Sequence, residues 1–171
     1  MDDAVRWGCF MAACITVAGA PAVWLMGTVA DRLGRTRTIM LCATCSLVAE
    51  LFFGFLLGQS LAIIVACGLW IGFWSVADSA VFKAGLTDMV RLNQRGTLLG
   101  IQSALGFFVT IVSPVVFGFI LQAYNGGVDP TRAVHWGPAF LVLGLGALAA
   151  PVLAFVLRRL PQSRLMAGGK R

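Results

Sequence analysis

The chain has 171 residues, of which 59% are hydrophobic and only 12% charged, and its formal net charge is +6. Soluble domains carry about 25% charged residues, so this chain lacks the polar side chains that would cover a soluble fold of its size. The same composition excludes an intrinsically disordered chain. The remaining class is an integral membrane protein, and its unbroken apolar runs favour helices over a β-barrel, whose strands alternate apolar and polar residues.

Five apolar runs predict transmembrane helices at residues 9–30, 39–58, 61–82, 98–122 and 138–157. At ~1.5 Å of rise per residue, each is about 30 Å long or longer and can cross the hydrocarbon core of a bilayer. We therefore predict an all-α polytopic membrane protein in which residues 1–171 form a single transmembrane domain. Residues 158–171 are expected to be a cytoplasmic tail, loosely held from Leu160 onward.

Prolines and glycines inside the runs predict local irregularity and close packing. Pro21, Pro114 and Pro151 are expected to kink or loosen their helices. Small residues let helix backbones approach each other in lipid. We therefore expect packing faces at Gly96, Gly100, Gly106, Gly118, Gly144 and Gly146.

The positive charges fall mainly on one side of the membrane. With five crossings, 11 of the 13 Lys and Arg residues lie on one side, and only Arg6 and Arg132 lie on the other. This asymmetry predicts an outside N-terminus and a cytoplasmic C-terminus in the plasma (inner) membrane. It accounts for the basic balance without nucleic acid, so membrane lipid is the expected partner. Asp2 and Asp3 make the leader acidic, so we expect no cleaved signal peptide.

The loop expected at residues 31–38 carries an unusual acid. Asp31 falls at the C-terminal end of a helix, where the helix dipole disfavours an anion. It therefore needs a partner, either Arg35 or the N-terminus of another helix. Gly34 can adopt a positive φ and end the first helix sharply. The pattern predicts a tight, charge-paired clasp between two membrane helices rather than an ordinary basic loop.

This segment resembles the signature loop of the major facilitator superfamily, which reads G-x-x-x-D-R-x-G-R followed by a basic residue. The matching positions are Gly27, Asp31, Arg32, Gly34 and Arg35. Where the family has the second basic residue, this chain has threonine, and its next arginine comes one position later. The resemblance implies that these five residues gate the cytoplasmic side of a transporter.

The loop expected at residues 83–97 extends the resemblance. The run Asp88-x6-Arg95-Gly96 is similar to the stretch between the fourth and fifth helices of a half in this family. There the acid joins a charge relay with the signature-loop arginine, which maps onto Asp88 and Arg35, and we place Arg95 in the same relay. By the same resemblance, Asp31 would face a helix N-terminus of the opposite half.

The resemblance covers nearly the whole chain as helices two to six of one half. Because the chain stops soon after its fifth span, we assign it to the second half, helices eight to twelve of twelve. This implies a partial chain of a secondary transporter for a small solute, with a coupled proton as an option. Its partner would be the missing N-terminal half or a second copy. The alternative is a self-contained five-helix protein, either a homodimeric half-transporter or a non-transporting accessory subunit.

Two acids lie inside the predicted spans, where ionisable residues are functional candidates. Glu50 lies in the middle of the second span. It is interpreted either as a structural group, protonated or bonded to a neighbouring helix, or as a functional acid. Asp78 follows Trp70 and Trp74 at four-residue spacing on the third span, which corresponds to a cavity-lining helix of the family. These three residues are therefore candidates for lining a cavity. Asp78 would couple a proton or pair with a cationic substrate, or instead pair with Lys83.

No residue pattern predicts an enzyme, a cofactor or a metal site. There is no phosphate-binding loop and no Ser/His/Asp grouping, and the single histidine, His135, is expected at the surface. The pair Cys42-x-x-Cys45 has metal or redox spacing. In an apolar span such cysteines are better interpreted as small hydrophobic residues.

Overall fold

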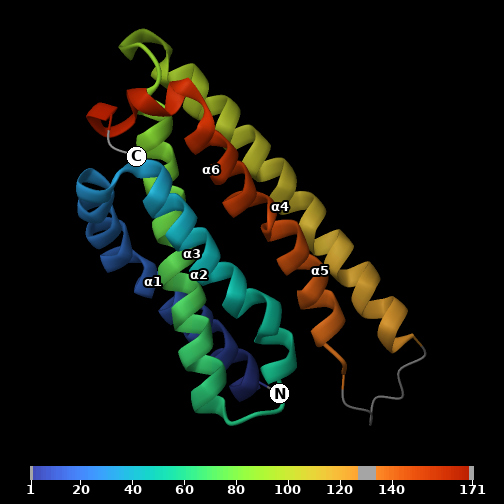
Figure 1. Cartoon of the computed structure of the whole chain (residues 1–171). Helices are drawn as coiled ribbons and strands as arrows, with labels where there is room; N and C mark the ends of the chain where they lie inside the picture. The colour runs from blue at the N-terminus through green and yellow to red at the C-terminus, as the bar shows by residue number, and fades with distance from the viewer. Residues whose placement is uncertain (1, 127–133, 170–171) are drawn as a thin grey trace.

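The computed structural model describes residues 2–126 and 134–169, which form a bundle of long helices (Figure 1). Within these residues, five helical stretches are long and apolar enough to cross a membrane, one for each predicted span. The all-α polytopic fold is therefore confirmed. The charges assigned above to Arg132, Lys170 and Arg171 lie outside the described residues. The elements are α1 (Asp2–Leu33), α2 (Arg35–Leu56), α3 (Leu61–Asp88), η1 (Leu92–Gln94), α4 (Arg95–Asn125), α5 (Gly137–Ala147), α6 (Ala149–Arg159) and η2 (Pro161–Gly169).

The two loops on the basic side are shorter than predicted. The expected loop 31–38 reduces to Gly34, because α1 ends at Leu33 and α2 begins at Arg35. The third span continues as helix to Asp88 instead of ending at Phe82. A run of apolar residues marks only the part of a helix inside hydrocarbon, whereas its internal hydrogen bonds allow it to continue into polar surroundings.

The internal prolines act differently in the three helices. The helices α1 and α4 continue through Pro21 and Pro114, whereas the fifth span divides at Leu148 into α5 and α6. Pro151 has no N–H to donate to the carbonyl of Ala147, so the helical ladder is interrupted just before it. Of the three expected irregularities, the break near Pro151 is present.

The helices α2 and α3 make most of the contacts in the bundle. The helix α3 packs against α1 and α2, and α2 also packs against α5 and α6. The helix α4 lies at the edge beside α5 (Figure 1), and none of its residues is buried in the described structure. Since lipid tails are as apolar as a protein core, close van der Waals packing holds membrane helices together. The packed core is accordingly made of small and medium side chains: Ala22, Ala30, Ile39, Cys42, Ala77 and Val81.

Gly72 marks a very close approach of α1 and α3. A Cβ at this position would overlap the backbone carbonyl of Ile15 on α1, whereas a Cβ at Gly68 would meet only the flexible end of the Ile15 side chain, 2.8 Å from Cδ1. We expect Gly72→Ala to push the helices apart and to lower the free energy of unfolding by about 1–2 kcal/mol more than Gly68→Ala. Reversible unfolding in mixed detergent micelles measures the difference. Equal losses in the two variants would contradict the close approach.

The predicted glycine packing faces divide into two groups. Gly144 lies beside Leu51 of α2, where an added Cβ would be 2.6 Å from Leu51 Cδ2. At five other positions no described atom outside the local helix backbone lies within 4 Å of an added Cβ: Gly96, Gly100, Gly106, Gly118 and Gly146. The glycines of α4 therefore face no partner among the described residues.

The expectation of a loosely held tail is wrong for Pro161–Gly169, which we call the C-terminal strap. The strap forms η2 and folds back onto α3 and α6. Its residue Ser163 is fully buried and Met166 is only 2% exposed. Ser163 Oγ donates a hydrogen bond to the carbonyl oxygen of Leu160 at 2.8 Å. Two inward side chains thus fix a segment whose sequence carries no helical or strand periodicity.

Candidate functional site

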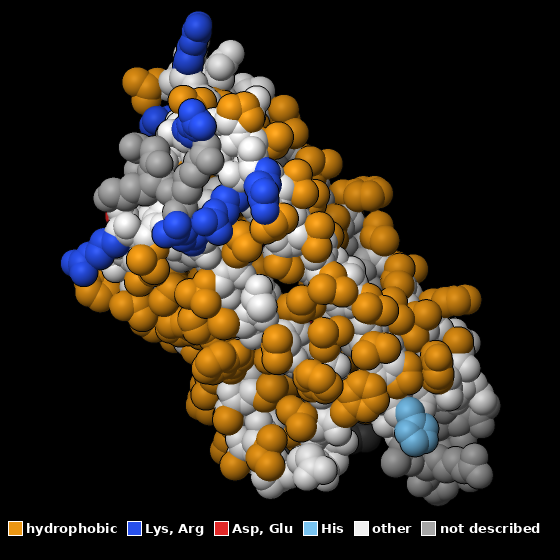
Figure 2. All heavy atoms as spheres, in the orientation of Figure 1, with side chains coloured by type: hydrophobic (Ala, Val, Ile, Leu, Met, Phe, Trp, Pro, Cys, Tyr) orange, Lys and Arg blue, Asp and Glu red, His pale blue; other side chains and the backbone are white. Residues whose placement is uncertain are grey.

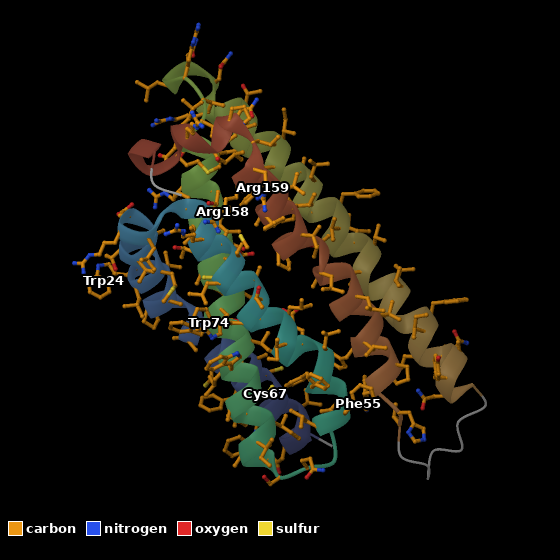
Figure 3. The ribbon with its side chains drawn as sticks, in the orientation of Figure 1. Trp24, Phe55, Cys67, Trp74, Arg158 and Arg159 are labelled. Carbon is orange, nitrogen blue, oxygen red and sulfur yellow. The ribbon has the colours of Figure 1, made fainter. Side chains whose placement is uncertain are left out.

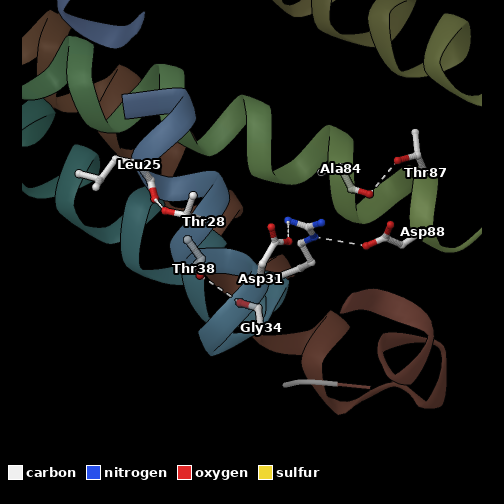
Figure 4. Close-up of polar contacts among 9 residues, drawn as sticks. Leu25, Thr28, Asp31, Gly34, Thr38, Ala84, Thr87 and Asp88 are labelled. Carbon is white, nitrogen blue, oxygen red and sulfur yellow. Dashed lines mark hydrogen bonds and ion pairs between the residues drawn. The ribbon is translucent and has the colours of Figure 1, made fainter. Parts of the chain in front are cut away.

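The turn between α1 and α2 consists of a single residue with a conformation that favours glycine. Gly34 has φ 99° and ψ 147°, a region that side-chain-bearing residues rarely adopt. Its N–H donates to the carbonyl of Ala30 at 3.0 Å. Its carbonyl accepts hydrogen bonds from Thr38 N at 3.3 Å and from Thr38 Oγ1 at 3.0 Å (Figure 4). The last turn of α1 and the first turn of α2 are therefore joined without a flexible loop.

This turn places Arg35 between two carboxylates from different helices. Arg35 Nη1 lies 2.9 Å from Asp31 Oδ1 at the end of α1, and Arg35 Nε donates to Asp88 Oδ2 at 3.2 Å at the end of α3 (Figure 4). The Arg35 side chain is only 14% exposed. A guanidinium presents donors in a fixed fork, so it can bind two carboxylates at once. We call Asp31, Arg35 and Asp88 the ion triad, which ties together the ends of α1, α2 and α3.

The other residues of the predicted signature loop and relay lie around the triad without forming part of it. Arg32 is exposed in the last turn of α1, and Gly27 lies one turn earlier with open space beside it. Arg95 begins α4, and its Nε is buried with no hydrogen-bond partner among the described residues. The structure thus brings Asp88 to Arg35, as the resemblance implied.

The C-terminal strap contributes residues that the sequence analysis missed. An added Cβ on Gly85 of α3 would lie 3.4 Å from Met166 Sδ and 3.5 Å from Arg35 Cβ. Met166 and Arg35 therefore both lie against Gly85. The available signal was the apolar pair Leu165-Met166 within a polar, basic tail. The strap therefore reaches the part of α3 that Arg35 also contacts.

The two intramembrane acids have different surroundings. Glu50 Oε1 accepts a hydrogen bond from Ser46 Oγ, one turn earlier on α2. Asp78 Oδ1 on α3 is buried and has no hydrogen-bond partner within the described structure. Of the two, Asp78 is the acid whose hydrogen-bonding capacity the described chain does not satisfy.

The aromatic residues before Asp78 lie at the contact between α2 and α3. Trp70 Nε1 donates to the carbonyl oxygen of Cys45 on α2 at 3.0 Å. The Trp70 and Trp74 rings lie 5.6 Å apart, and Trp74 also meets Phe73 at 5.2 Å. Offset and edge-on contacts at these separations are favourable. This part of the predicted stripe therefore joins two helices of the bundle.

His135 is exposed, in agreement with the sequence interpretation. Its backbone N–H donates to Asn125 Oδ1 at 2.8 Å, and its carbonyl accepts from Asn125 Nδ2 at 3.1 Å. Asn125 thus closes the end of α4 onto the segment that precedes α5.

Comparisons with known proteins give a consistent family match. Residues 4–170 match the family model described as Major Facilitator Superfamily. A curated relative, an uncharacterised transporter of Schizosaccharomyces pombe, is 36% identical over 69 residues, which is 40% of this chain and 12% of that protein. No solved structure matches the chain.

Two other relatives match over most of the chain at lower identity. The ascochitine biosynthesis cluster MFS transporter of Didymella fabae is 24% identical over 145 residues, 83% of this chain and 26% of that protein. Inorganic phosphate transporter 1-6 of Oryza sativa is 26% identical over 151 residues, 80% of this chain and 28% of that protein. The chain therefore spans about a quarter of the length of these two relatives.

Proposed function

The chain belongs to the major facilitator superfamily, and we propose that it forms helices two to six of the second half of a secondary transporter for a small solute. The observation that carries the proposal is the ion triad, in which one guanidinium binds carboxylates from two other helices. We further propose that the chain lies in the plasma membrane with its N-terminus outside and its C-terminus in the cytoplasm.

The triad is proposed to latch the cytoplasmic side of the transporter. Transporters of this kind work by rocking two halves around a central site, which requires helix ends on one side to meet and separate. The salt bridges of Arg35 hold the ends of α1 and α3 to α2 at 2.9 and 3.2 Å. Gly27 and Arg32 are proposed as accessory residues of this latch, and Arg95 as the group through which α4 responds to it.

The exposed edge helix supports a partner beyond the described bundle. At the glycines of α4 no described atom outside the local helix backbone lies within 4 Å of an added Cβ, and apolar grooves run along both sides of this helix. The groove beside α3 is lined by residues that include Phe82, Leu86, Ile101 and Leu105. Small residues and grooves are typical of helix–helix contacts in lipid. The missing N-terminal half is our proposed partner.

A second copy of this chain fits the same observation and defines the alternative function. A self-contained five-helix protein would cover the α4 face by forming a homodimer, as a half-transporter or an accessory subunit. Crosslinking of the chain in membranes distinguishes the two: a discrete dimer supports this alternative. Sequencing the in-frame DNA upstream of Met1 gives an independent answer, since about seven further spans would complete twelve.

Asp78 is the intramembrane residue that we propose to meet the solute or a coupled proton. Its Oδ1 is buried without a hydrogen-bond partner in the described chain, and such groups favour a ligand or proton that satisfies them. Trp70 and Trp74 are proposed to position α3 against α2 beside it. Glu50, whose carboxylate already accepts from Ser46, is proposed as a structural acid.

Asp31→Asn tests the latch. The amide keeps the shape of the side chain but removes the charge that faces Arg35, so we expect solute uptake to fall roughly tenfold, within the usual range of coupling between two states. Uptake is measured in cells that express the complete reading frame, after a screen for the solute whose uptake depends on it. The amount of protein in the membrane should be unchanged.

The matched control is Asp3→Asn, which makes the same charge change at an exposed acid near the start of α1. Its uptake should equal that of the parent protein. Unchanged uptake in Asp31→Asn would contradict the proposal that the signature loop acts as a latch.

A further inference from the structure

One end of the described bundle carries a large excess of positive charge. Figure 2 shows the Lys and Arg side chains gathered at this end, above a surface that is mainly apolar. Nine described cations lie there with two carboxylates, Asp31 and Asp88. The cations are Arg32, Arg35, Arg37, Lys83, Arg91, Arg95, Arg158, Arg159 and Arg164. Only Arg35 is needed to explain the ion triad.

The end of α6 places cations directly beside an apolar outer surface. Arg158 and Arg159 occupy its last turn (Figure 3). The guanidinium of Arg159 lies over the Phe155 ring, 4.9 Å from its centroid, and the Phe155 side chain is 44% exposed. Val152 and Val156 on the same helix are also exposed. A positive group therefore lies against an apolar face that lipid chains would cover.

The C-terminal strap adds a cation and an apolar side chain next to this helix end. Ser163 and Met166 face inward and are buried, whereas Arg164 and Leu165 are exposed. Leu165 is 59% exposed. Exposed basic and apolar residues on one short segment are typical of chains that lie in the interface of a membrane. The strap is thus fixed to the protein on one side and open to the bilayer surface on the other.

We propose that Arg158, Arg159 and Arg164 bind the headgroup of an anionic glycerophospholipid, whose acyl chains lie along the exposed face of α6. The guanidinium fork matches a phosphate ester in a bidentate manner. Phe155 holds Arg159 at the boundary between headgroup and hydrocarbon, and Leu165 enters the interface beside it. The occupant is a lipid and not free phosphate, because the cations lie above an apolar surface that only a lipid would cover.

The lipid would also hold the C-terminal strap in place over the ion triad. Met166 lies against Gly85 of α3, as Arg35 does, so a headgroup bound to Arg164 would hold the strap near this position. The effect on transport rests on the proposed function, whereas lipid binding does not. Lipid selectivity is measured without transport, so failure of one is distinguishable from failure of the other.

The test reconstitutes the 171-residue chain in phosphatidylcholine vesicles that contain spin-labelled phosphatidylglycerol or spin-labelled phosphatidylcholine as probe. Electron paramagnetic resonance measures the fraction of each probe immobilised by the protein. We expect the protein to prefer phosphatidylglycerol roughly fivefold in total, the order of the attraction between a basic side chain and an anionic membrane surface, shared among the three arginines. In the triple variant Arg158→Gln, Arg159→Gln, Arg164→Gln this preference should disappear.

The matched control neutralises three exposed cations of the same end on other elements: Arg37→Gln, Lys83→Gln, Arg91→Gln. It should keep most of the preference. An equal loss of the preference in both triple variants would overturn the site, because it would show a diffuse charge effect. Retention of the preference without Arg158, Arg159 and Arg164 would also overturn it. If the first triple variant does not insert, the single replacement of the exposed Arg159 by Gln decides. A loss of roughly twofold, one arginine's share of the fivefold total, supports the site, and no loss overturns it.

Discussion

Replacing Arg35 by methionine is expected to lower the free energy of unfolding by about 2 kcal/mol, between the values for exposed and for buried ion pairs. Arg35 is 14% exposed and lies within 3.2 Å of Asp88, whose side chain is 29% exposed. Methionine fills a similar volume but leaves the Asp88 carboxylate without this cation. Repulsion between Asp31 and Asp88 would then act on the ends of α1 and α3.

Arg35→Lys separates charge from geometry. A lysine keeps the positive charge but offers a single ammonium in place of the guanidinium fork. We therefore expect Arg35→Lys to lower the free energy of unfolding by less than Arg35→Met does. Adding Asp88→Asn to Arg35→Met should restore part of the stability, because the carboxylate that has lost its Arg35 ion pair is then removed. If Arg35 and Asp88 did not interact, the stability loss of the double variant would equal the sum of the losses of Arg35→Met and Asp88→Asn.

Unfolding can be followed with a thiol-reactive dye. Cys42 is fully buried in the core between helices, whereas Cys9 is exposed and sets the baseline. The dye signal from buried thiols should rise at a lower temperature, or at a lower denaturant concentration, in Arg35→Met than in the parent protein. If the free energy of unfolding of Arg35→Met differed from that of the parent by less than about 0.5 kcal/mol, the effect of an ordinary surface substitution, a structural role for the triad would be contradicted.

The membrane helices could be predicted because lipid imposes a simple rule on the sequence. Runs of about 20 apolar residues identify spans irrespective of their neighbours, and all five are helical in the structure. Their ends could not be predicted as well. The polar extension of α3 to Asp88 follows from internal hydrogen bonding and contacts with other elements, neither of which is visible in hydropathy.

The ion triad was only partly accessible from local sequence. Asp31 and Arg35 are four residues apart, and the unfavourable helix-end position of the acid indicated that it needs a partner. Asp88 lies 53 residues from Arg35, so its place came from the family resemblance. Met166 was missed because one buried side chain in a short, polar segment produces no periodic pattern.

The aromatic stripe shows the limit of periodicity in a membrane helix. Spacing by four residues places Trp70, Trp74 and Asp78 on one face of α3. It does not say which neighbour that face meets, because apolar side chains fit lipid, another helix or a cavity wall equally well. The hydrogen bond from Trp70 to Cys45 shows that at this position the neighbour is α2.

Gly34→Ala is expected to lower the free energy of unfolding by about 3 kcal/mol, the upper end of the range for a strained backbone residue. At φ 99° and ψ 147° an alanine Cβ is strained, and Gly34 is buried, so the chain has little room to rearrange. Relaxing the turn would disturb the hydrogen bonds that Gly34 makes with Ala30 and Thr38. Arg35, the next residue, would move with it.

Gly58→Ala is the matched control, because Gly58 also has a positive φ, 115°, but is exposed in the turn between α2 and α3. An exposed turn can change conformation, so we expect a loss of only about 1 kcal/mol. The decisive comparison repeats both changes in an Arg35→Met background. The effect of Gly34→Ala should shrink there, because the contact it disturbs is already absent, while the effect of Gly58→Ala should stay the same. Full additivity for both glycines would show that the turn and the ion triad are independent, and Gly34 would then matter for backbone geometry alone.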